Sequence, residues 1–566
     1  MSKKPIYILG TGLSHNGSVV LLKEGQICVA IEKERITRIK HDGGNDTAAI
    51  QYCLEAEGIQ LSDVDLVVQC ENFEIPSRDF FRGERLFKGN KEPKLISISH
   101  HLAHAYSAVG TSPFTSCNVM VIDGCGSPLE QYLLLYPNEK ESIASDVFNS
   151  IQMKCEKDSF YHFDGQHMMP LFKDFSEMSD HSSSEIALPT TKHSIGGFYA
   201  TISNYVFGNM DDVGKLMGLA PYGKSGVYDY EVFEFINDRL FVKEDWKTFL
   251  NQPSQGYTFF KEHFEYYANV AKWAQEQVEK AVLQCIKLRT KQFPHENLCY
   301  SGGVALNAVA NAKLEDSNVA NSIYFEPAAS DNGLSLGCAF YGWLSYLKQP
   351  KKESNGSTCF GKHYSEEAIL QAYEEYKPEL KMIDLYGESK LLHYVAEALL
   401  RGKTIGWFQS GSEFGPRALG RRSILAHPGI ENMKNRINAS IKFREDFRPF
   451  APAVLQEKVS DYFEVGRNSP YMILVDRTKK EHLENLKNVT HQDGSARVQT
   501  VEASWNPKFY NLIQTFYELS GIAVLLNTSF NKKGMPIVET PKEAFDLFRE
   551  TALDVLVIEN FVFLKN

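Results

Sequence analysis

The chain has 566 residues, which is more than one hydrophobic core usually supports, so we expect two or more domains. Its formal net charge of −11 argues against a general nucleic-acid binder, because affinity for a phosphate backbone comes from excess Lys and Arg. Ten cysteines without a C-x-x-C pair indicate neither a zinc ribbon nor a disulfide framework. The sequence has no secretory leader pattern and no apolar run long enough to span a bilayer, so we expect a cytoplasmic protein without a membrane partner.

The chain opens with a strand, a glycine-containing loop and two more strands. Apolar runs predict strands at residues 6–10, 18–22, 27–32, 65–69, 95–98 and 119–122. A helix at about 47–57 follows the first three strands. This order of elements resembles the start of an actin-like ATPase domain.

Two histidines, His100 and His104, follow the strand predicted at 95–98 and open a helix. At a spacing of i,i+4 they project from one face, where two imidazoles can hold one metal ion. Asp123 follows the strand at 119–122, at the end where open α/β sheets place their chemistry, and Asp331 lies in a similar strand-to-helix loop. These four residues are the candidate metal ligands. Because such a histidine pair is also common on surfaces and at helix ends, the pattern alone leaves both interpretations open.

A second strand, turn and helix lie near residue 300. A long helix at about 264–293 precedes a strand at 298–301, and Gly302 and Gly303 form the turn that follows it. Glycines there let backbone N–H groups approach a phosphate or a nucleoside closely. Residues 349–365, rich in Lys, Ser, Gly and Pro, predict a linker between a first domain at 1–348 and a second domain at 366–566.

The second domain contains a basic cluster in an otherwise acidic chain. Residues 410–450 hold eight Lys or Arg against four Asp or Glu, and they include Arg417, Lys442 and Arg444. Arginine forks grip phosphate oxygens and a lysine adds a point charge, so the cluster predicts an anionic ligand. The alternative is a solvated face, or arginines paired with acidic neighbours. Flanking glycines and prolines, which fix the backbone around the charges, favour the ligand.

Three further positions follow this cluster along the chain. Arg497 lies at the start of a predicted strand, and an apolar strand at 523–526 ends in Asn527 and Ser529. A buried strand that ends in amides and hydroxyls commonly faces a ligand. We therefore expect these side chains to line the same anion site.

Taken together, these motifs resemble the natural-product O-carbamoyltransferases, which include the nodulation-factor, cephalosporin and aminoglycoside carbamoyltransferases. The resemblance spans nearly the whole chain. The matching segments are His15 to Ser18, Glu34-Arg35, Lys40-His41, His100 to His104, Asp123-Gly124, Gly214 to Gly223, Gly302 to Asn307, Asp331 and the basic motifs from Glu413 to Asn531.

The resemblance implies an α/β fold with an α+β C-terminal part. The first domain would be actin-like and similar to the tRNA threonylcarbamoyl transferase subunit, and the second would be similar to threonylcarbamoyl-AMP synthase. The second domain would form carbamoyl-adenylate from carbamoyl phosphate and ATP with Mg²⁺, and the first would pass the carbamoyl group to a hydroxyl of a small natural product in antibiotic or toxin biosynthesis. The resemblance implies a small-molecule acceptor and no nucleic-acid partner, and it is compatible with a homodimer.

The resemblance also implies roles for individual residues. Fe²⁺ or another divalent metal would be held by His100, His104, Asp123 and Asp331. Arg417, Lys442, Arg444 and Arg497 would bind carbamoyl phosphate and ATP with Asn527 and Ser529, and Met472 would form a pocket wall. The nucleotide-binding positions of the first domain would be Gly124, Gly126, Gly302, Gly303 and Asn307.

His15 is our candidate general base, and Lys40 would hold a phosphate or the carbonyl oxygen. The alternative for His15 is a structural hydrogen bond. The sequence has His15-Asn16 where the family more often has His-Asp, so a carboxylate that supports His15 is either absent or supplied from elsewhere.

Two other functions remain open on the sequence. One is a carbamoyl or threonylcarbamoyl transferase that acts on tRNA or protein, and the other is a nucleotide-dependent regulatory protein that does not transfer the group. The acceptor itself is not evident. Residues 158–193 carry no recognised motif, and we expect them to line the acceptor pocket, with Asp164, Asp174, Glu177 and Asp180 favouring a cationic or polyhydroxylated molecule. The alternative is a surface excursion.

Overall fold

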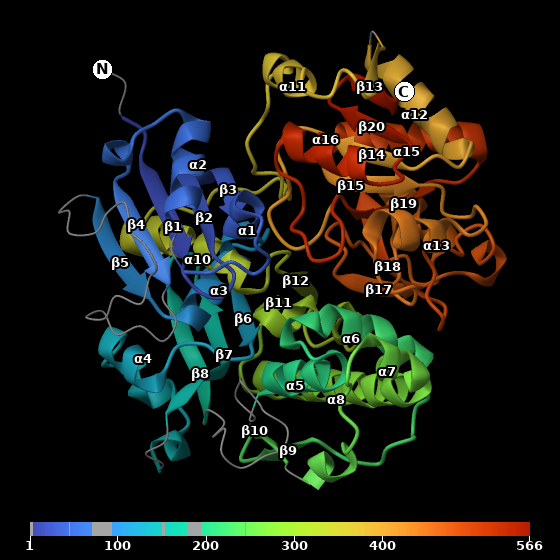
Figure 1. Cartoon of the computed structure of the whole chain (residues 1–566). Coiled ribbons are helices and arrows are strands. Elements are labelled where there is room, and N and C mark those ends of the chain that lie inside the picture. Colours follow the sequence, from blue (N-terminus) through green and yellow to red (C-terminus); the bar gives the residue numbers. More distant parts are fainter. Residues whose placement is uncertain are drawn as a thin grey trace. The chain divides into compact units, whose positions relative to one another are not determined.

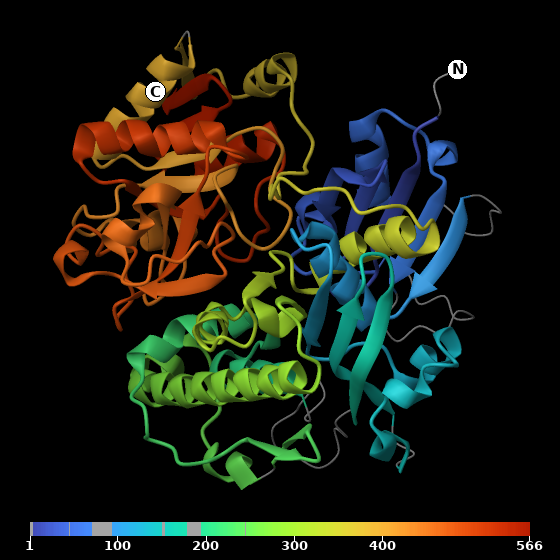
Figure 2. The same ribbon diagram turned by 180° about the vertical axis from the view of Figure 1, so that it is seen from behind.

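A computed structural model describes residues 4–44, 46–70, 93–149, 153–177, 194–243, 245–385 and 387–566 (Figures 1 and 2). The chain folds into two compact units. The first holds residues 1–28, 43–54 and 59–354, and the second holds 29–42, 55–58 and 355–566. Residues 29–42 lie within the first domain predicted at 1–348, but they pack with the second unit.

The first unit is built on two five-stranded sheets. The order of the first sheet is β3 (Gln26–Glu32), β2 (Ser18–Lys23), β1 (Tyr7–Gly12), β4 (Leu66–Cys70) and β5 (Lys94–Ile98), and β3 passes into the second unit from Val29 onward. The order of the second sheet is β12 (Ser322–Phe325), β11 (Asn297–Ser301), β6 (Cys117–Ile122), β7 (Lys154–Phe163) and β8 (Met168–Glu177). The central strands β1 and β6 are buried along their whole length, as their apolar sequences predict.

Two helices pack against each other and against these sheets. Helix α3 (His100–Thr111) contacts β6, β7 and β11, and α10 (Leu334–Tyr341) contacts β1, β2 and β4. A Cβ atom on Gly337 would lie 1.7 Å from the carbonyl oxygen of Ala103, so the approach of α10 to α3 requires glycine there. This close packing fixes the ends of both helices, which carry candidate site residues.

The other described elements of the first unit are helices and a small two-stranded sheet. They are α2 (Thr47–Glu57), α4 (Leu129–Leu135), α5 (Ile195–Phe207), α6 (Val213–Leu219), α7 (Tyr257–Glu262), α8 (Phe264–Gln292), α9 (Ala308–Asp316), β9 (Phe233–Ile236) and β10 (Arg239–Val242). The long helix predicted at 264–293 is confirmed as α8. Its Trp273 packs edge-on against Phe198 of α5, with ring centroids 5.6 Å apart.

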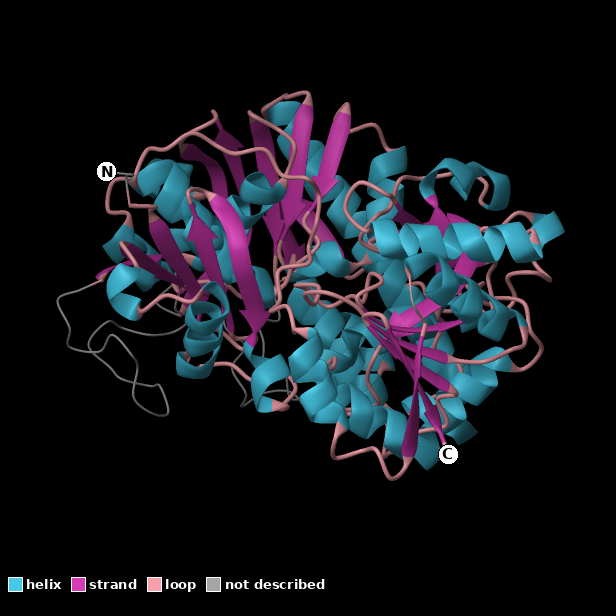
Figure 3. Ribbon diagram, turned by 90° about the horizontal axis from the view of Figure 1, so that it is seen from above, coloured by secondary structure: helices cyan, strands magenta, loops and turns pink. Residues whose placement is uncertain are grey.

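The second unit is built on one nine-stranded mixed sheet. Its order is β13 (Leu380–Asp384), β21 (Phe561–Lys565), β20 (Val555–Ile558), β14 (Ile405–Phe408), β15 (Arg422–Ala426), β19 (Val524–Ser529), β16 (Ala451–Leu455), β18 (Ser495–Val501) and β17 (Leu474–Arg477). Its helices are α1 (Lys33–Thr37), α11 (Glu366–Tyr373), α12 (Glu388–Leu400), α13 (Met433–Ile437), α14 (Val459–Tyr462), α15 (Pro507–Ser520) and α16 (Pro541–Glu550). Helices and strands occur in both units, so the predicted mixed α/β class is confirmed (Figure 3). Among the described helices, none has the length and apolar character needed to cross a bilayer.

Candidate functional site

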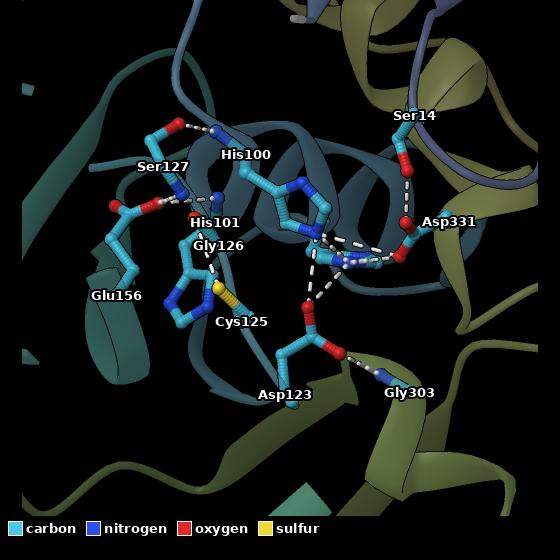
Figure 4. Close-up of polar contacts among 12 residues, drawn as sticks. Ser14, His100, His101, Asp123, Cys125, Gly126, Ser127, Glu156, Gly303 and Asp331 are labelled. Carbon is cyan, nitrogen blue, oxygen red and sulfur yellow. Dashed lines mark hydrogen bonds and ion pairs between the residues drawn. The ribbon is translucent and has the colours of Figure 1, made fainter. Parts of the chain in front are cut away.

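The four candidate metal ligands converge in the first unit (Figure 4). His100 and His104 lie one turn apart on α3, and their Nε2 atoms are 3.1 Å apart. Asp123 follows β6, and its Oδ2 lies 2.9 Å from Nε2 of His100, while Oδ1 of Asp331, at the turn before α10, lies 3.5 Å from the same nitrogen. One ligand atom from each of the four residues lies within 4.8 Å of the others. Two imidazoles and two carboxylates suit a divalent transition metal.

Burial and charge set the protonation of this cluster. Burial lowers the pKa of His100, but the carboxylates of Asp331 and Asp123 outweigh it and leave the pKa well above its ordinary value. Burial raises the pKa of Asp123, but hydrogen bonds from His100 and His104 leave it well below its usual range. The pKa of Asp331 is likewise lowered, because the charge of His100 opposes the effect of burial. Both carboxylates are therefore held ionised, as metal ligands must be.

Neighbouring groups orient both carboxylates. The backbone N–H of Gly303 donates to Oδ1 of Asp123 at 2.9 Å, which leaves Oδ2 facing His100, and the hydroxyl of Ser14 donates to Oδ2 of Asp331. Such outer contacts are typical of metal sites, where they fix the ligand geometry.

The start of α3 is held by a buried carboxylate, Glu156 of β7. Its Oε2 accepts the backbone N–H groups of His101 and Ser127, each at 3.1 Å, and the hydroxyl of Ser127 accepts the N–H of His100 at 2.9 Å. Lys173 of β8 donates to Oε1 of Glu156 at 2.6 Å, and both side chains are fully buried. This ion pair therefore fixes the helix end that presents the histidines.

We expect Lys173→Met to lower the free energy of unfolding by about 3–5 kcal/mol, because it leaves Glu156 as an unpaired buried charge. Urea denaturation checks this value. The double variant Glu156→Gln/Lys173→Met removes both charges and should recover part of the loss. Equal stability of Lys173→Met and the natural protein would contradict the role of this pair.

The glycines predicted to bind nucleotide have different surroundings. Gly302 has φ 93°, and a Cβ there would lie 2.3 Å from the carbonyl oxygen of Ile122, so this turn requires glycine. A Cβ on Gly124 would meet nothing within 4 Å, whereas the N–H of Gly126 donates to the carbonyl oxygen of Glu156 at 2.8 Å. The backbone N–H of Gly303 donates to the carboxylate of Asp123, as described above. The nucleotide-binding role of these positions stays a prediction.

Asn307 is placed at the start of a helix. Its Oδ1 accepts the backbone N–H of Ala310 at 3.1 Å and so caps α9. Its Oδ1 also accepts from Gln275 at 3.0 Å, and its Nδ2 donates to Gln275 at 3.0 Å. Within the described structure, the side chain of Asn307 is thus engaged in the packing of α8 and α9.

His15, the candidate base, has a carboxylate partner that the sequence pattern did not identify. Nε2 of His15 lies 3.1 Å from Oδ1 of Asp211, which lies in a 3₁₀ turn at Met210–Asp212. The hydrogen bond to Asp211 raises the pKa of His15 above its ordinary value, against the effect of burial. The side chain of His15 is half exposed, at 53%. The carboxylate missing from His15-Asn16 is therefore supplied from elsewhere in the chain.

The predicted basic cluster gathers in the second unit. Lys442 ends a helical turn after α13, and Phe443 then adopts a left-handed conformation with φ 49°. The ammonium group of Lys442 donates to the carbonyl oxygen of Ser529 at 2.6 Å, to its hydroxyl at 3.1 Å and to Oδ1 of Asn531 at 2.5 Å. Nε of Arg444 donates to Oδ1 of Asn438 at 2.8 Å, and its guanidinium lies over the ring of Phe450.

The charges of this cluster repel one another. Burial and the nearby Arg444, Arg448 and Lys40 hold the pKa of Lys442 well below its ordinary value. Burial and neighbouring arginines likewise lower the pKa of Arg444 and Arg497, and burial with Arg448 lowers the pKa of Arg417 to about 10. The Nε atoms of Arg417 and Arg497 are buried and have no hydrogen-bond acceptor among the described residues. Such a cluster favours the binding of an anion.

The other predicted residues of this unit lie around the cluster. Nδ2 of Asn527 donates to the carbonyl oxygen of Ala418 at 3.1 Å and so braces the segment after Arg417. Met472 is buried and adopts a left-handed conformation with φ 55°, which is strained for a methionine and typical of functional sites.

Glu413 accepts the backbone N–H groups of Leu419, Arg421 and Arg422. Of the acidic neighbours expected as alternative partners of the arginines, Glu413, Glu445 and Asp446, the first is thus occupied by backbone, whereas Glu445 lies 3.8 Å from Arg448.

Comparison with known proteins assigns the chain to a family. A model described as the carbamoyltransferase N-terminus matches residues 7–80 and 78–340, and one described as the carbamoyltransferase C-terminus matches residues 396–565. The chain belongs to the carbamoyltransferase family. It is therefore an enzyme of the carbamoyltransferase type.

Two relatives and one solved structure illustrate the similarity of this carbamoyltransferase to known proteins. Nodulation protein NolNO of Sinorhizobium fredii is 32% identical over 97% of this chain and 79% of its own length. The 3′-hydroxymethylcephem-O-carbamoyltransferase of Amycolatopsis lactamdurans is 26% identical over 92% of both chains. The crystal structure of HypF from T. kodakarensis covers 62% of this chain and 49% of its own, with 15% identity and a TM-score of 0.38.

The segment expected to line the acceptor pocket of this carbamoyltransferase is only partly described. Residues 178–193, with Asp180, lie outside the described residues. Asp174 is fully buried and paired with Arg239 at 2.6 Å and with Lys157 at 2.9 Å, so the expectation that it contacts the acceptor is wrong. Asp164 accepts backbone N–H groups in the turn between β7 and β8, and Glu177 ends β8. The described part of this segment is a paired β-hairpin of the second sheet.

Proposed function

We propose that this carbamoyltransferase is an ATP-dependent O-carbamoyltransferase that acts on a hydroxyl of a small natural product. The observation that carries the first step is that the Nε atoms of Arg417 and Arg497 are buried without an acceptor among the described residues. Lys442 and Arg444 belong to the same cluster, and a polyanion would relieve the repulsion among these charges. Carbamoyl phosphate and ATP are both concentrated anions that such a cluster neutralises and orients.

The first step forms carbamoyl-adenylate. Water releases phosphate from carbamoyl phosphate, the carbamate oxygen attacks the α-phosphorus of ATP, and pyrophosphate leaves. Because negative charge develops on the leaving phosphates, the guanidinium groups stabilise the transition state more than the ground state. We place Lys40 in this step as well, since it lies in the second unit and its charge contributes to the lowered pKa of Lys442.

The second step transfers the carbamoyl group to the acceptor. The acceptor hydroxyl attacks the carbonyl carbon of carbamoyl-adenylate, AMP leaves with the bond electrons, and His15 takes the hydroxyl proton at Nδ1, since its Nε2 faces Asp211. Asp211 supports this role, because its charge stabilises the imidazolium that forms. His100, His104, Asp123 and Asp331 would hold Fe²⁺ or another divalent metal, which when bound supplies Lewis-acid polarisation of a phosphate or carbonyl oxygen.

The pairing of His15 with Asp211 predicts how the rate of carbamoyl transfer depends on pH. Transfer requires neutral His15, so its rate should rise with pH through the raised pKa of this residue. Asp211→Asn removes the charge that raises the pKa, and the acidic limb of the rate profile should shift to lower pH. Asp212→Asn is the matched control, because Asp212 pairs with Lys215 instead. Identical acidic limbs in Asp211→Asn and the natural enzyme would show that His15 is not the titrating base.

A labelling experiment tests the proposed acceptor class. The enzyme is incubated with ATP, Mg²⁺, Fe²⁺ and carbonyl-labelled carbamoyl phosphate, and separately with hydroxymethyl compounds, polyhydroxylated small molecules and bulk tRNA. We expect label on a small hydroxylated molecule only with ATP present. Label on tRNA alone, or transfer without ATP, would contradict the proposal. The hydroxymethyl group of a cephem is the first acceptor to try, since a relative is named for it.

A further inference from the structure

An early segment of the chain is built into the second unit. Residues 29–42 comprise the end of β3, the short helix α1 and the turn after it, and they pack with residues 355–566. In this segment Glu32 and Arg35 form an ion pair, with Nε of Arg35 2.5 Å from Oε2 of Glu32. Their side chains are only 7% and 1% exposed. A buried ion pair of this kind needs further hydrogen bonds to offset its desolvation.

Both members of the ion pair form hydrogen bonds with the backbone of Gly415. Nη2 of Arg35 donates to the carbonyl oxygen of Gly415 at 2.8 Å, and the N–H of Gly415 donates to Oε1 of Glu32 at 2.9 Å. The ion pair thus binds both backbone polar groups of Gly415, whose φ of 111° fixes a turn. Two residues later comes Arg417. The ion pair therefore holds the backbone two residues before Arg417.

A second arginine of the same segment holds the other loop of the basic cluster. Nη1 of Arg38 donates to the carbonyl oxygen of Ile537 at 2.8 Å, and Nη2 donates to that of Pro536 at 2.9 Å. These carbonyls follow the loop whose Ser529 and Asn531 hold the ammonium group of Lys442. Arg38 also lies 3.1 Å from Glu543, which caps α16.

We propose that Glu32, Arg35 and Arg38 are positioning residues for the formation of carbamoyl-adenylate. They hold the two loops that present Arg417 and Lys442 at a fixed separation, while Lys40, a few residues on, adds its charge to the same cluster. This inference rests on the proposed function. A shift of about 1 Å in a catalytic group can reduce a rate on the order of 100-fold. Losing the contacts of any one of these three positioning residues should therefore lower the rate of pyrophosphate release measurably.

The test separates the two half-reactions. Arg35→Lys keeps the charge but cannot bind Glu32 and Gly415 with one planar group. We expect kcat/KM for carbamoyl-phosphate-dependent pyrophosphate release to fall at least tenfold, while transfer from supplied carbamoyl-adenylate to a hydroxymethyl cephem stays within twofold. Arg401→Lys is the matched control, because Arg401 is an exposed arginine of the same unit paired with Glu397. Arg38→Lys and Glu32→Gln provide milder variants if Arg35→Lys does not fold.

The outcomes are distinct. If the natural enzyme releases no pyrophosphate, the proposed function fails. If the natural enzyme releases it and all three variants match Arg401→Lys, the positioning role is overturned. If both half-reactions fall by the same factor in folded variants, the residues act on the stability of the whole molecule and the proposal is likewise overturned.

Discussion

Arg497→Met is expected to reduce the rate of pyrophosphate release by about 10²–10³-fold, the loss typical of removing one preorganised group that stabilises developing charge. The same change should leave the free energy of unfolding unchanged or raise it. The reason is that Arg497 is repelled by Arg417, Arg444 and Arg448, and its Nε has no acceptor among the described residues. Steady-state assays and urea denaturation of one preparation measure both effects.

Arg422→Met is the control for this variant. Arg422 is fully buried in the same unit, donates to the carbonyl oxygen of Gln409 at 2.9 Å and stacks on Phe408. Arg422→Met should lower the free energy of unfolding by about 2 kcal/mol, because it leaves the carbonyl oxygen of Gln409 unpaired and removes the packing on Phe408. Lower stability in Arg497→Met than in the natural enzyme, with activity retained, would mean that the cluster is structural.

Asp331→Asn is expected to weaken divalent-metal binding by more than about 100-fold, because it removes a charged ligand from a converging set of four. Carbamoyl transfer to the acceptor should fall to a similar extent. Pyrophosphate release should not change, since the basic cluster lies in the other unit. Metal content after reconstitution with Fe²⁺, measured by mass spectrometry, and transfer of labelled carbamoyl groups check the two effects.

Glu326→Gln is the matched control for the metal variant. Glu326 is a buried carboxyl of the first unit that contacts Thr111 and Ala328 and is not among the four ligands. Burial raises its pKa to about 7. It should retain metal and transfer. Full metal content in Asp331→Asn would contradict the ligand assignment.

The local sequence pattern identifies residues that recur at a regular spacing or that follow a strand. The i,i+4 spacing of His100 and His104, and the loops after strands that hold Asp123 and Asp331, make these four residues candidates, and in the structure their ligand atoms converge. Apolar runs likewise predict β1 and β6, and an amphipathic pattern predicts the helix α8. These features depend on neighbours in the sequence, which is why they can be read without the fold.

Other parts of the site depend on contacts between distant residues. Asp211 lies in a short turn without a motif, and only folding brings it 3.1 Å from His15. Arg448 belongs to the basic segment, but nothing in its spacing separates it from a solvated arginine. The packing of residues 29–42 with the second unit has no signal in composition. Nothing near Asp174 in the sequence indicates that its partners are Lys157 and Arg239 and not an acceptor.

The central claim is that the basic cluster forms carbamoyl-adenylate, and one measurement tests it most directly. The purified enzyme is supplied with ATP, Mg²⁺ and carbamoyl phosphate without an acceptor, and pyrophosphate, phosphate and ADP are quantified. We predict pyrophosphate and phosphate in equal amounts, dependent on carbamoyl phosphate, with no ADP. Release of ADP instead of pyrophosphate, or no release by active enzyme, would contradict the account.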